Sequence, residues 1–170
     1  MCGICGIINT NNSEIVTQEQ IVKMRDSMIH RGPDDYGVWC NNNIGLGHRR
    51  LSIIDISKNG RQPMTNRDKS IYIVYNGEFY NYEEHRVLLE KKGCKFQSSS
   101  DTEVILYLYQ LYGLEETLKR INGMFSFCLV DLKKGVQYLV RDRFGIKPLY
   151  YLIQDNSISF ASEIKALYKK

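Results

Sequence analysis

Cys2 directly follows the initiator methionine, and a thiol at the chain start can do chemistry that an internal thiol cannot. A free cysteine is only a few per cent ionised near neutral pH, so a cysteine nucleophile needs a base within reach. Removal of Met1 would leave an α-amine on the same residue. With a pKa of about 7.7–8.0, that amine is partly neutral and can accept the thiol proton. The position therefore suggests a nucleophile that acts only after Met1 has left.

Other interpretations of Cys2 stay open on the residues alone. It is compatible with a buried thiol on an edge strand, or with a dyad formed with His30, His48 or His85, because such partners need only meet in space. Cys2 and Cys5 have the spacing of half a zinc site, yet residues three apart on a strand point to opposite faces. No second Cys pair or spaced His pair completes a ligand set, so we expect no metal.

Three further sets of polar residues stand beside apolar runs. Arg50 begins the run that ends at Ile54, and a buried arginine usually has a carboxylate partner, such as an internal aspartate. Asn76-Gly77-Glu78 ends a predicted strand, either as a hairpin turn or as two neighbouring hydrogen-bond donors for a developing oxyanion. Asp101 either favours the first turn of a helix or holds an ammonium group.

The composition is that of an ordinary globular protein. The 170 residues, 43% of them hydrophobic and 25% charged, suit one domain. No apolar run approaches the ~18 residues that cross a membrane, and the chain start lacks the basic region of a signal peptide, so we expect a cytoplasmic protein with reduced thiols. The net charge of +4 comes from scattered basic residues, whereas nucleic-acid binding needs a clustered basic face. We expect neither a membrane nor a nucleic-acid partner.

The elements that must position these residues are many short strands and a few separate helices, which predicts an α+β fold with antiparallel sheets. Strands are predicted at Cys2–Asn9, Tyr36–Cys40, Ile44–Ile54, Ser70–Tyr75, Met124–Asp131, Val136–Arg141, Leu149–Ile153 and Ser157–Ala161. Helices are predicted from the capping box Thr17–Gln20 to about His30, at Tyr82–Lys92 with Asn81 as its cap, from the capping box Ser100–Glu103 through Tyr112, and at Leu114–Ile121. A long loop, of a length that often serves function, is expected from Asp55 to Arg67.

Several of these stretches together resemble the class II glutamine amidotransferases, and within them the glutaminase domain of glutamine-hydrolysing asparagine synthetases. Each segment is weak alone, but they follow the family order over nearly the whole chain. The matching segments are Met1-Cys-Gly-Ile4, His30-Arg-Gly-Pro-Asp34, Arg50-Leu-Ser-Ile-Ile-Asp55, Tyr75-Asn-Gly-Glu-Phe-Tyr-Asn81, Ser100-Asp-Thr-Glu-Val104, Gly123-Met-Phe-Ser-Phe127, Arg141-Asp-Arg-Phe-Gly-Ile-Lys-Pro-Leu-Tyr150 and Ala161-Ser-Glu-Ile-Lys-Ala-Leu167.

The resemblance implies a four-layer αββα sandwich of two antiparallel sheets, the fold of N-terminal-nucleophile hydrolases. It also implies catalytic roles. Cys2 would be the nucleophile, and its α-amine would be the base that later protonates departing ammonia. Asn76 and Gly77 would form the oxyanion hole.

The resemblance implies substrate contacts as well. Arg50 would pair with the α-carboxylate of glutamine in the bidentate manner suited to a guanidinium group. Asp101 and Glu78 would receive its α-ammonium group. The lining of the pocket would come from Leu51, Ile53 and Ile54.

The resemblance further implies that residues 1–170 are a glutaminase domain. Asparagine synthetases continue past the segment that ends at Leu167 into an ATP-pyrophosphatase domain, which adenylates aspartate and receives ammonia through a tunnel. Its Ser-Gly-Gly-x-Asp-Ser loop does not occur here, so we favour a domain excised from a longer protein over a free-standing glutaminase. ATP and Mg are expected only in that absent domain, and no cofactor in this one. The expected partners are glutamine and the C-terminal synthetase domain, with a homodimer as a further option.

Two alternatives remain. Relatives of asparagine synthetase amidate sugar acids or other carboxylates, and the acceptor binds outside this domain. An enzyme-like module could also have kept the fold as a non-catalytic ligand sensor, although the intact set of Cys2, Arg50, Asn76 and Asp101 argues against it.

Overall fold

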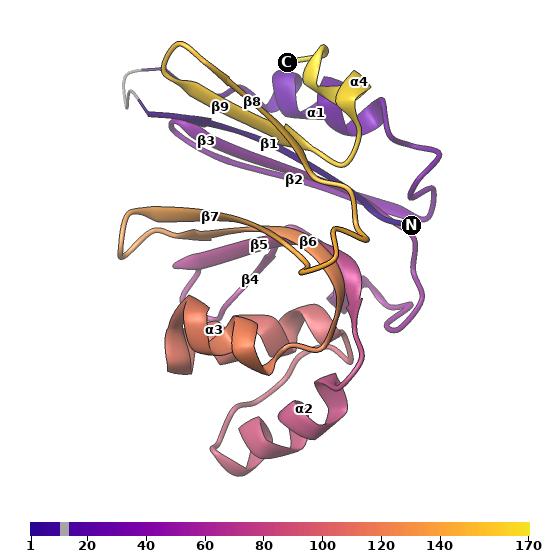
Figure 1. The fold of residues 1–170 in the computed structure, drawn as a ribbon, viewed down its shortest axis with the longest axis vertical. Helices are drawn as coiled ribbons and strands as arrows, with labels where there is room; N and C mark the ends of the chain where they lie inside the picture. Colours follow the sequence, from indigo (N-terminus) through magenta and orange to yellow (C-terminus); the bar gives the residue numbers. More distant parts are fainter. Residues whose placement is uncertain (11–13) are drawn as a thin grey trace.

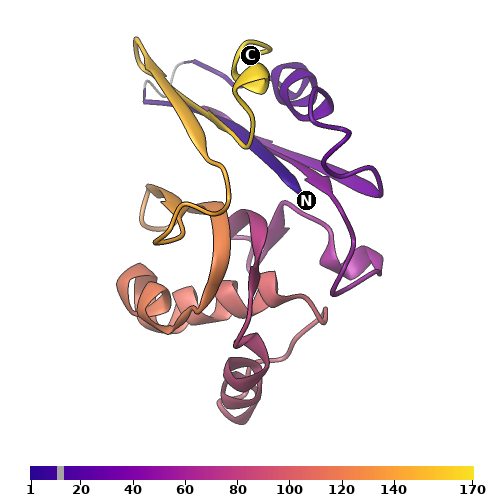
Figure 2. The same ribbon diagram turned by 45° about the vertical axis from the view of Figure 1, so that its right-hand side comes forward.

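Two antiparallel sheets, stacked face to face, form the centre of the fold (Figures 1 and 2). The structure is a computed structural model that describes residues 1–10 and 14–170. The first sheet has the order β2-β3-β1-β9-β8, with the bounds Asp35–Asn41, Ile44–Arg50, Gly3–Asn9, Ser157–Ala161 and Tyr150–Gln154. The second has the order β4-β5-β6-β7, with the bounds Met64–Thr65, Ile71–Phe79, Gly123–Asp131 and Val136–Arg141.

Helices cover the outer face of each sheet and complete four layers (Figure 1). α1 (Gln18–Asp26) and α4 (Ile164–Leu167) pack on the first sheet. α3 (Asp101–Arg120) packs on the second sheet with α2 (Tyr82–Lys91) beside it. The predicted α+β class and αββα layering are confirmed. In the described parts of the chain, no helix is long and apolar enough to cross a bilayer.

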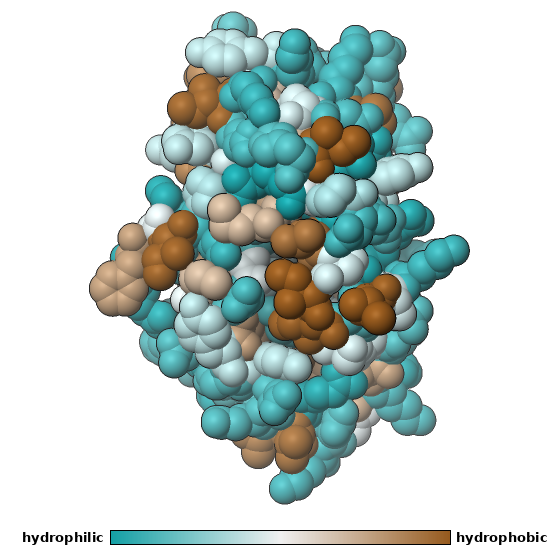
Figure 3. Space-filling model, turned by 90° about the vertical axis from the view of Figure 1, so that its right-hand side faces the viewer, coloured by the Kyte–Doolittle hydropathy of each residue, from teal (hydrophilic) through white to brown (hydrophobic). Residues whose placement is uncertain are grey.

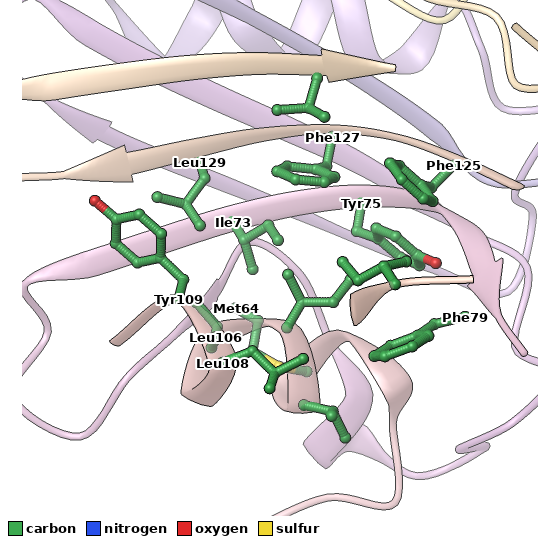
Figure 4. Close-up of a cluster of buried hydrophobic side chains, with 14 of the residues drawn as sticks. Met64, Ile73, Tyr75, Phe79, Leu106, Leu108, Tyr109, Phe125, Phe127 and Leu129 are labelled. Carbon is green, nitrogen blue, oxygen red and sulfur yellow. The ribbon is translucent and has the colours of Figure 1, made fainter. Parts of the chain in front are cut away.

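Alternation along the strands builds a buried layer on each side of both sheets. On β1, Ile4 and Ile8 face the second sheet, whereas Cys5 and Ile7 face the α1 side, as expected for residues that alternate across a strand. The largest apolar cluster lies between the second sheet and α3 (Figure 4). The two sheets are therefore held at a fixed spacing by one core and braced from outside by two others.

Of the three predicted helix caps, the one at Thr17 forms as predicted, and those at Asn81 and Ser100 differ. Thr17 forms the predicted capping box with Gln20, whose Oε1 accepts from the Thr17 N–H at 2.9 Å. Asn81 precedes α2 but makes no cap hydrogen bond. Its side chain instead accepts from the Asn122 N–H at 2.9 Å and donates to the Arg120 carbonyl at 3.1 Å. This long-range pairing, which ties the start of α2 to the end of α3, replaces the local cap.

The capping box predicted at the start of α3 is incomplete. Ser100 caps the helix by accepting from the Thr102 N–H at 3.2 Å. The Glu103 carboxylate turns away from the cap and accepts from the N–H and hydroxyl of Ser98 at 2.8 and 2.6 Å. The buried Glu103 therefore fixes the loop that leads into α3.

Two strand ends differ from the prediction by more than one residue, and both lie where the candidate site forms. β3 ends at Arg50 rather than Ile54, because the Leu51 N–H turns out of the sheet toward the Cys2 sulfur. β5 continues to Phe79, so Asn76-Gly77 is not a hairpin turn.

Gly77 lies inside β5 because only glycine fits there. It pairs with Phe125 on β6, and a Cβ on Gly77 would lie 2.5 Å from the Met124 carbonyl oxygen. Real side chains do not approach that closely, so the glycine permits close packing of the two strands rather than a turn.

The first helix is shorter than predicted, because α1 ends at Asp26 and not near His30. The loop predicted from Asp55 to Arg67 contains a short 3-10 helix (Lys58–Gly60) and β4. Gly113, with a φ of 76°, divides α3 into the two helices that the sequence predicted. The short helix α4 was not predicted.

His48 joins the two sheets through one buried hydrogen bond. It lies on β3 with no exposed surface, and its Nε2 donates to the Tyr75 carbonyl of β5 at 3.1 Å. A carbonyl oxygen can only accept, so the imidazole proton resides on Nε2. Burial lowers the pKa of His48 to about 4, which keeps the ring neutral.

The free energy of unfolding should therefore fall as the pH drops from about 6.5 toward about 4. The unfolded chain binds a proton at His48 near pH 6.5, whereas the folded protein does so only near pH 4, so the unfolded state holds more protons between these values. The loss should reach roughly 3 kcal/mol. Urea denaturation between pH 4 and 8 measures it, and His48→Gln should flatten the dependence. Equal slopes for both proteins would contradict a buried neutral imidazole.

Candidate active site

One pocket collects every site residue that the sequence singled out. It opens where the chain start, the loop after β3, the end of β5 and the start of α3 meet, and it encloses about 690 Å3 including its open mouth. Its lining includes Cys2, Arg50, Leu51, Ile53, Ile54, Asn76, Gly77, Glu78 and Asp101. The fold thus brings together residues from both sheets and from α3.

The mouth of this pocket is apolar. Met1, Ile53 and Ile54 belong to the lining and are 55%, 62% and 38% exposed. Figure 3 views the side that carries the N-terminus in Figure 1, and apolar side chains gather near its middle. Ile53 and Ile54 therefore lie at the entrance rather than on the buried wall.

Cys2 lies on the pocket wall, and its thiol hydrogen-bonds to the backbone of one residue, Leu51. The Leu51 N–H donates to the Cys2 sulfur at 3.4 Å, and the thiol donates to the Leu51 carbonyl at 3.6 Å. Burial raises the pKa of the Cys2 thiol, while the Leu51 backbone, the terminal ammonium group and Arg50 oppose the rise. A thiol with a raised pKa stays protonated, so it needs a base close by.

No histidine hydrogen-bonds to Cys2, although all three lie in the described part of the chain. His30, His48 and His85 bond instead to the Glu163 carboxylate, the Tyr75 carbonyl and the Arg120 carbonyl. The Cys–His dyad that the sequence left open does not form. The Cys2 thiol therefore has no histidine base among its hydrogen-bond partners.

Cys2 and Cys5 point to different layers, as predicted for residues three apart on a strand. Cys5 is fully buried in the apolar cluster beneath α1, whereas Cys2 lines the pocket. Across residues 1–10 and 14–170, no group of three or more His, Cys, Asp or Glu side chains is placed to hold a metal ion.

Arg31 fixes the chain start. Its Nε donates to the Cys2 carbonyl at 2.9 Å, and its Nη1 pairs with the Glu163 carboxylate at 3.2 Å. The Ile4 N–H donates to Ser162 Oγ at 3.0 Å. These contacts fix the backbone of Cys2 beside the pocket, and with it the position that a free amine would occupy.

Arg50 is a buried cation that forms no ion pair with any described carboxylate. It is 6% exposed, and its guanidinium donates to the Ser57 carbonyl at 2.7 Å and to the Asp55 carbonyl. The salt bridge to an internal aspartate that the sequence allowed does not form. Two neutral oxygens orient the guanidinium and leave its charge for an anionic ligand.

Asp101 is the opposite case, a buried carboxylate that no described lysine or arginine neutralises. It is 5% exposed and opens α3, and its Oδ2 accepts from the Phe79 N–H at 3.1 Å. Burial raises the pKa of Asp101, while hydrogen bonds from Phe79, Thr102 and Ser100 oppose the rise. A cationic ligand group beside it would stabilise the ionised form.

Asn76 provides a free hydrogen-bond donor in the pocket. Its side chain is 1% exposed, and its Nδ2 has no hydrogen-bond partner among the described residues. A buried unpaired amide is costly, so a native structure usually has a reason for one. An oxygen atom of a bound ligand would satisfy it.

Gly77 provides a second donor, because its N–H points away from β6. The Tyr75 and Phe79 N–H groups, two residues to either side, both turn to that outer edge, where Gln62 and Asp101 accept them. N–H groups of alternate residues on a strand point to the same edge.

The hydrogen bonds of β6 also show that the Gly77 N–H points away from β6. Phe125, its partner on β6, donates its N–H to the Asp142 carboxylate and accepts the Asp142 N–H with its carbonyl. The Gly77–Phe125 pair is therefore not hydrogen-bonded, and the Gly77 N–H is directed at the pocket.

Some pocket residues were missed by the sequence analysis. Gln62, Tyr75 and Lys147 line the pocket and are 6%, 2% and 6% exposed. Gln62 lies in the long loop that was expected to serve function, and Lys147 in a segment that carries the family resemblance. Neither has a local pattern that shows which way its side chain points.

The four-layer αββα arrangement of two antiparallel sheets is the fold of the N-terminal-nucleophile hydrolases. Comparison with known protein families identifies the family within that fold class. The model of the glutamine amidotransferase domain matches residues 1–170, and the chain belongs to this family.

Known relatives agree with this assignment. Asparagine synthetase (glutamine-hydrolyzing) 1 of Bacillus subtilis is 45% identical over 169 residues, which are 98% of this chain and 26% of that protein. Putative asparagine synthetase (glutamine-hydrolyzing) 2 of Methanocaldococcus jannaschii is 45% identical over 185 residues, covering 98% of this chain and 35% of that protein. The chain thus spans 26% and 35% of the length of these relatives. The predicted resemblance to asparagine synthetases is confirmed.

A solved structure shows the same fold at low sequence similarity. Glutamine phosphoribosylpyrophosphate amidotransferase from B. subtilis, complexed with ADP and GMP, matches with a TM-score of 0.83 at 20% identity. The match covers 98% of this chain and 43% of that chain.

Gly60→Ala should weaken the binding of a carboxylate ligand by about tenfold or more, because a Cβ at Gly60 would overlap Nη2 of Arg50 and displace the guanidinium. Calorimetric titration with L-glutamine, on a chain whose Cys2 is also replaced by alanine, measures the change. Asn59→Ala is the matched control, since the Asn59 side chain binds the Gln97 carbonyl instead. Unchanged binding in Gly60→Ala would contradict a role for Arg50 in the site.

Proposed function

We propose that this domain hydrolyses the side-chain amide of L-glutamine to glutamate and ammonia. The observation that carries the proposal is the pair Arg50 and Asp101, two buried opposite charges that line one pocket and form no ion pair with each other. An α-amino acid carries the matching carboxylate and ammonium groups on one carbon atom. Arg50 would bind the carboxylate, and Asp101, aided by the half-buried Glu78, would bind the ammonium group.

The reacting end of the substrate would then meet Cys2. After Met1 is removed, the free amine of Cys2 takes the thiol proton, and the thiolate attacks the side-chain carbonyl carbon. The carbonyl oxygen becomes an oxyanion, which accepts hydrogen bonds from Asn76 Nδ2 and the Gly77 N–H. The amine next gives its proton to the leaving nitrogen, so ammonia departs and a thioester remains on Cys2.

Water completes the reaction. It attacks the thioester carbonyl, with the amine again acting as base, and the same two donors stabilise the second oxyanion. The carbon–sulfur bond breaks, glutamate leaves and the thiol of Cys2 is restored. Leu51, Ile53 and Ile54 would cover the substrate during both steps.

We further propose that the ammonia serves asparagine synthesis from aspartate and ATP in a C-terminal synthetase domain. The support comes from relatives named glutamine-hydrolyzing asparagine synthetases, of which this chain covers only 26% and 35%. ATP and Mg would bind in that synthetase domain, and the glutaminase domain would need no cofactor. A cytoplasmic location and a homodimer belong to the same proposal.

Cys2→Ala should lower ammonia release from glutamine by about 10⁴-fold or more, because it removes the only proposed nucleophile. A coupled ammonia assay measures the rate, and circular dichroism checks that the variant is folded. Cys94→Ala, which changes a half-buried thiol on a different surface, should keep full activity. Retained hydrolysis in Cys2→Ala would sink the mechanism. Protein that intact mass shows to retain Met1 should be inactive as well, because its Cys2 nitrogen is an amide.

A further inference from the structure

The outer edge of β5 reaches the pocket beyond the short strand β4. β4 is two residues long and pairs only with Ile73 and Tyr72. Among the described residues, no strand pairs with that edge between Val74 and Phe79. An uncovered edge leaves backbone donors and acceptors that need other partners when they are buried.

Two buried side chains supply these partners at Tyr75. Gln62 Oε1 accepts from the Tyr75 N–H at 2.6 Å, and His48 Nε2 donates to the Tyr75 carbonyl at 3.1 Å. Gln62 comes from the loop before β4, and His48 from β3 of the other sheet. Both backbone polar groups of Tyr75 are thus held by side chains that lie outside the second sheet.

The orientation of the Gln62 amide is fixed by its two partners. The Tyr75 N–H requires an acceptor, so the atom that faces it is oxygen. The amide nitrogen then faces Thr102 Oγ1 at 3.3 Å, one residue after Asp101 in α3. Gln62 therefore links the end of β5 to the helix that carries the ammonium acceptor.

His48 does not line the pocket, and its Nδ1 is buried without a hydrogen-bond partner in the described residues. Its one hydrogen bond goes to the carbonyl of the peptide group that joins Tyr75 to Asn76. Burial of a polar side chain without a hydrogen bond costs free energy. The bond to the Tyr75 carbonyl is therefore what stabilises His48 in this position.

Asn76 and Gly77 directly follow Tyr75 in β5, so their positions depend on how the Tyr75 backbone is held. We propose that His48 and Gln62 are positioning residues that clamp the Tyr75 backbone and so aim Asn76 Nδ2 and the Gly77 N–H at the oxygen of the scissile amide. The inference rests on the proposed glutamine hydrolysis. With Asp101 holding the Phe79 N–H, the clamp pairs the N–H groups on either side and leaves that of Gly77 for substrate.

Such a clamp matters because oxyanion donors act over a narrow range of distances. Donors must stand about 2.7–3.1 Å from the position that the oxyanion will take, and errors of about 0.5 Å reduce their effect. A strand end without a neighbour would otherwise be free to shift along that edge. A shifted donor should weaken the transition state more than the ground state, so kcat should suffer more than KM.

The kinetic test uses three variants of the Met1-free chain. His48→Leu should lower kcat for glutamine hydrolysis by about tenfold or more with KM changed less than about twofold. His48→Gln places an amide N–H where Nε2 stood and should restore kcat to within about threefold of the wild type. Leu46→Ala is the matched control, since Leu46 is buried between the sheets on the same strand and face, and kcat should stay unchanged.

Two results would overturn the clamp in this test. One is a folded His48→Leu variant with wild-type kcat. The other is an equal loss of kcat in Leu46→Ala, which would show that general packing and not the hydrogen bond is responsible. If His48→Leu does not fold, Gln62→Met takes its place, with the same expected fall in kcat.

Hydrogen exchange tests the clamp without any substrate. In Gln62→Met the Tyr75 amide should exchange at least about tenfold faster than in the wild type, while the Val74 amide, which faces β6, keeps its rate. Imidazole 15N signals at pH 7 should report a proton on Nε2 of His48 and none on Nδ1. Unchanged exchange at Tyr75 or a proton on Nδ1 would refute the clamp. A wild-type chain that does not hydrolyse glutamine would refute the proposed function instead, and these two readouts would still decide the clamp.

Discussion

Arg50 and Asp101 keep two opposite charges buried on one pocket without an ion pair between them. Burial of an unpaired charge costs several kcal/mol, and a direct ion pair would relieve that cost while blocking the pocket. The fold instead gives each charge neutral partners of its own. The Ser57 and Asp55 carbonyls hold the guanidinium, and the Phe79 N–H holds the carboxylate. The charges that remain suit a zwitterionic amino acid, which is the ligand that we propose for this pocket.

The sandwich sets the distance between the proposed nucleophile and the proposed oxyanion donors, because they belong to different sheets. Cys2 leads into β1 of the first sheet, whereas Asn76 and Gly77 lie on β5 of the second. The packed layer between the sheets and the His48–Tyr75 hydrogen bond fix that distance. Loss of that hydrogen bond should therefore impair the site without touching a residue that contacts substrate.

Residue types identified side chains that the fold brings to one pocket, but local pattern did not predict the residues that support them. The strand and helix patterns predicted the α+β class with antiparallel sheets, whereas the αββα layering was implied by the family resemblance. Asn76-Gly77 looked like a hairpin turn because that pair favours turns, yet close packing on β6 is what requires Gly77. Gln62 was missed because its partners lie 13 and 40 residues away. Such pairings come from tertiary structure and leave no local signal.

Ligand binding to the Met1-free Cys2→Ala chain tests the central claim most directly. Calorimetric titration would compare L-glutamine with 4-carbamoylbutanoate, which lacks the α-ammonium group, and with 4-aminobutanamide, which lacks the α-carboxylate. Each analogue leaves one buried charge unmatched, so each should bind at least about tenfold more weakly than glutamine. Binding of either analogue as tight as that of glutamine would contradict the assignment of Arg50 and Asp101 as the two ends of an amino-acid clamp.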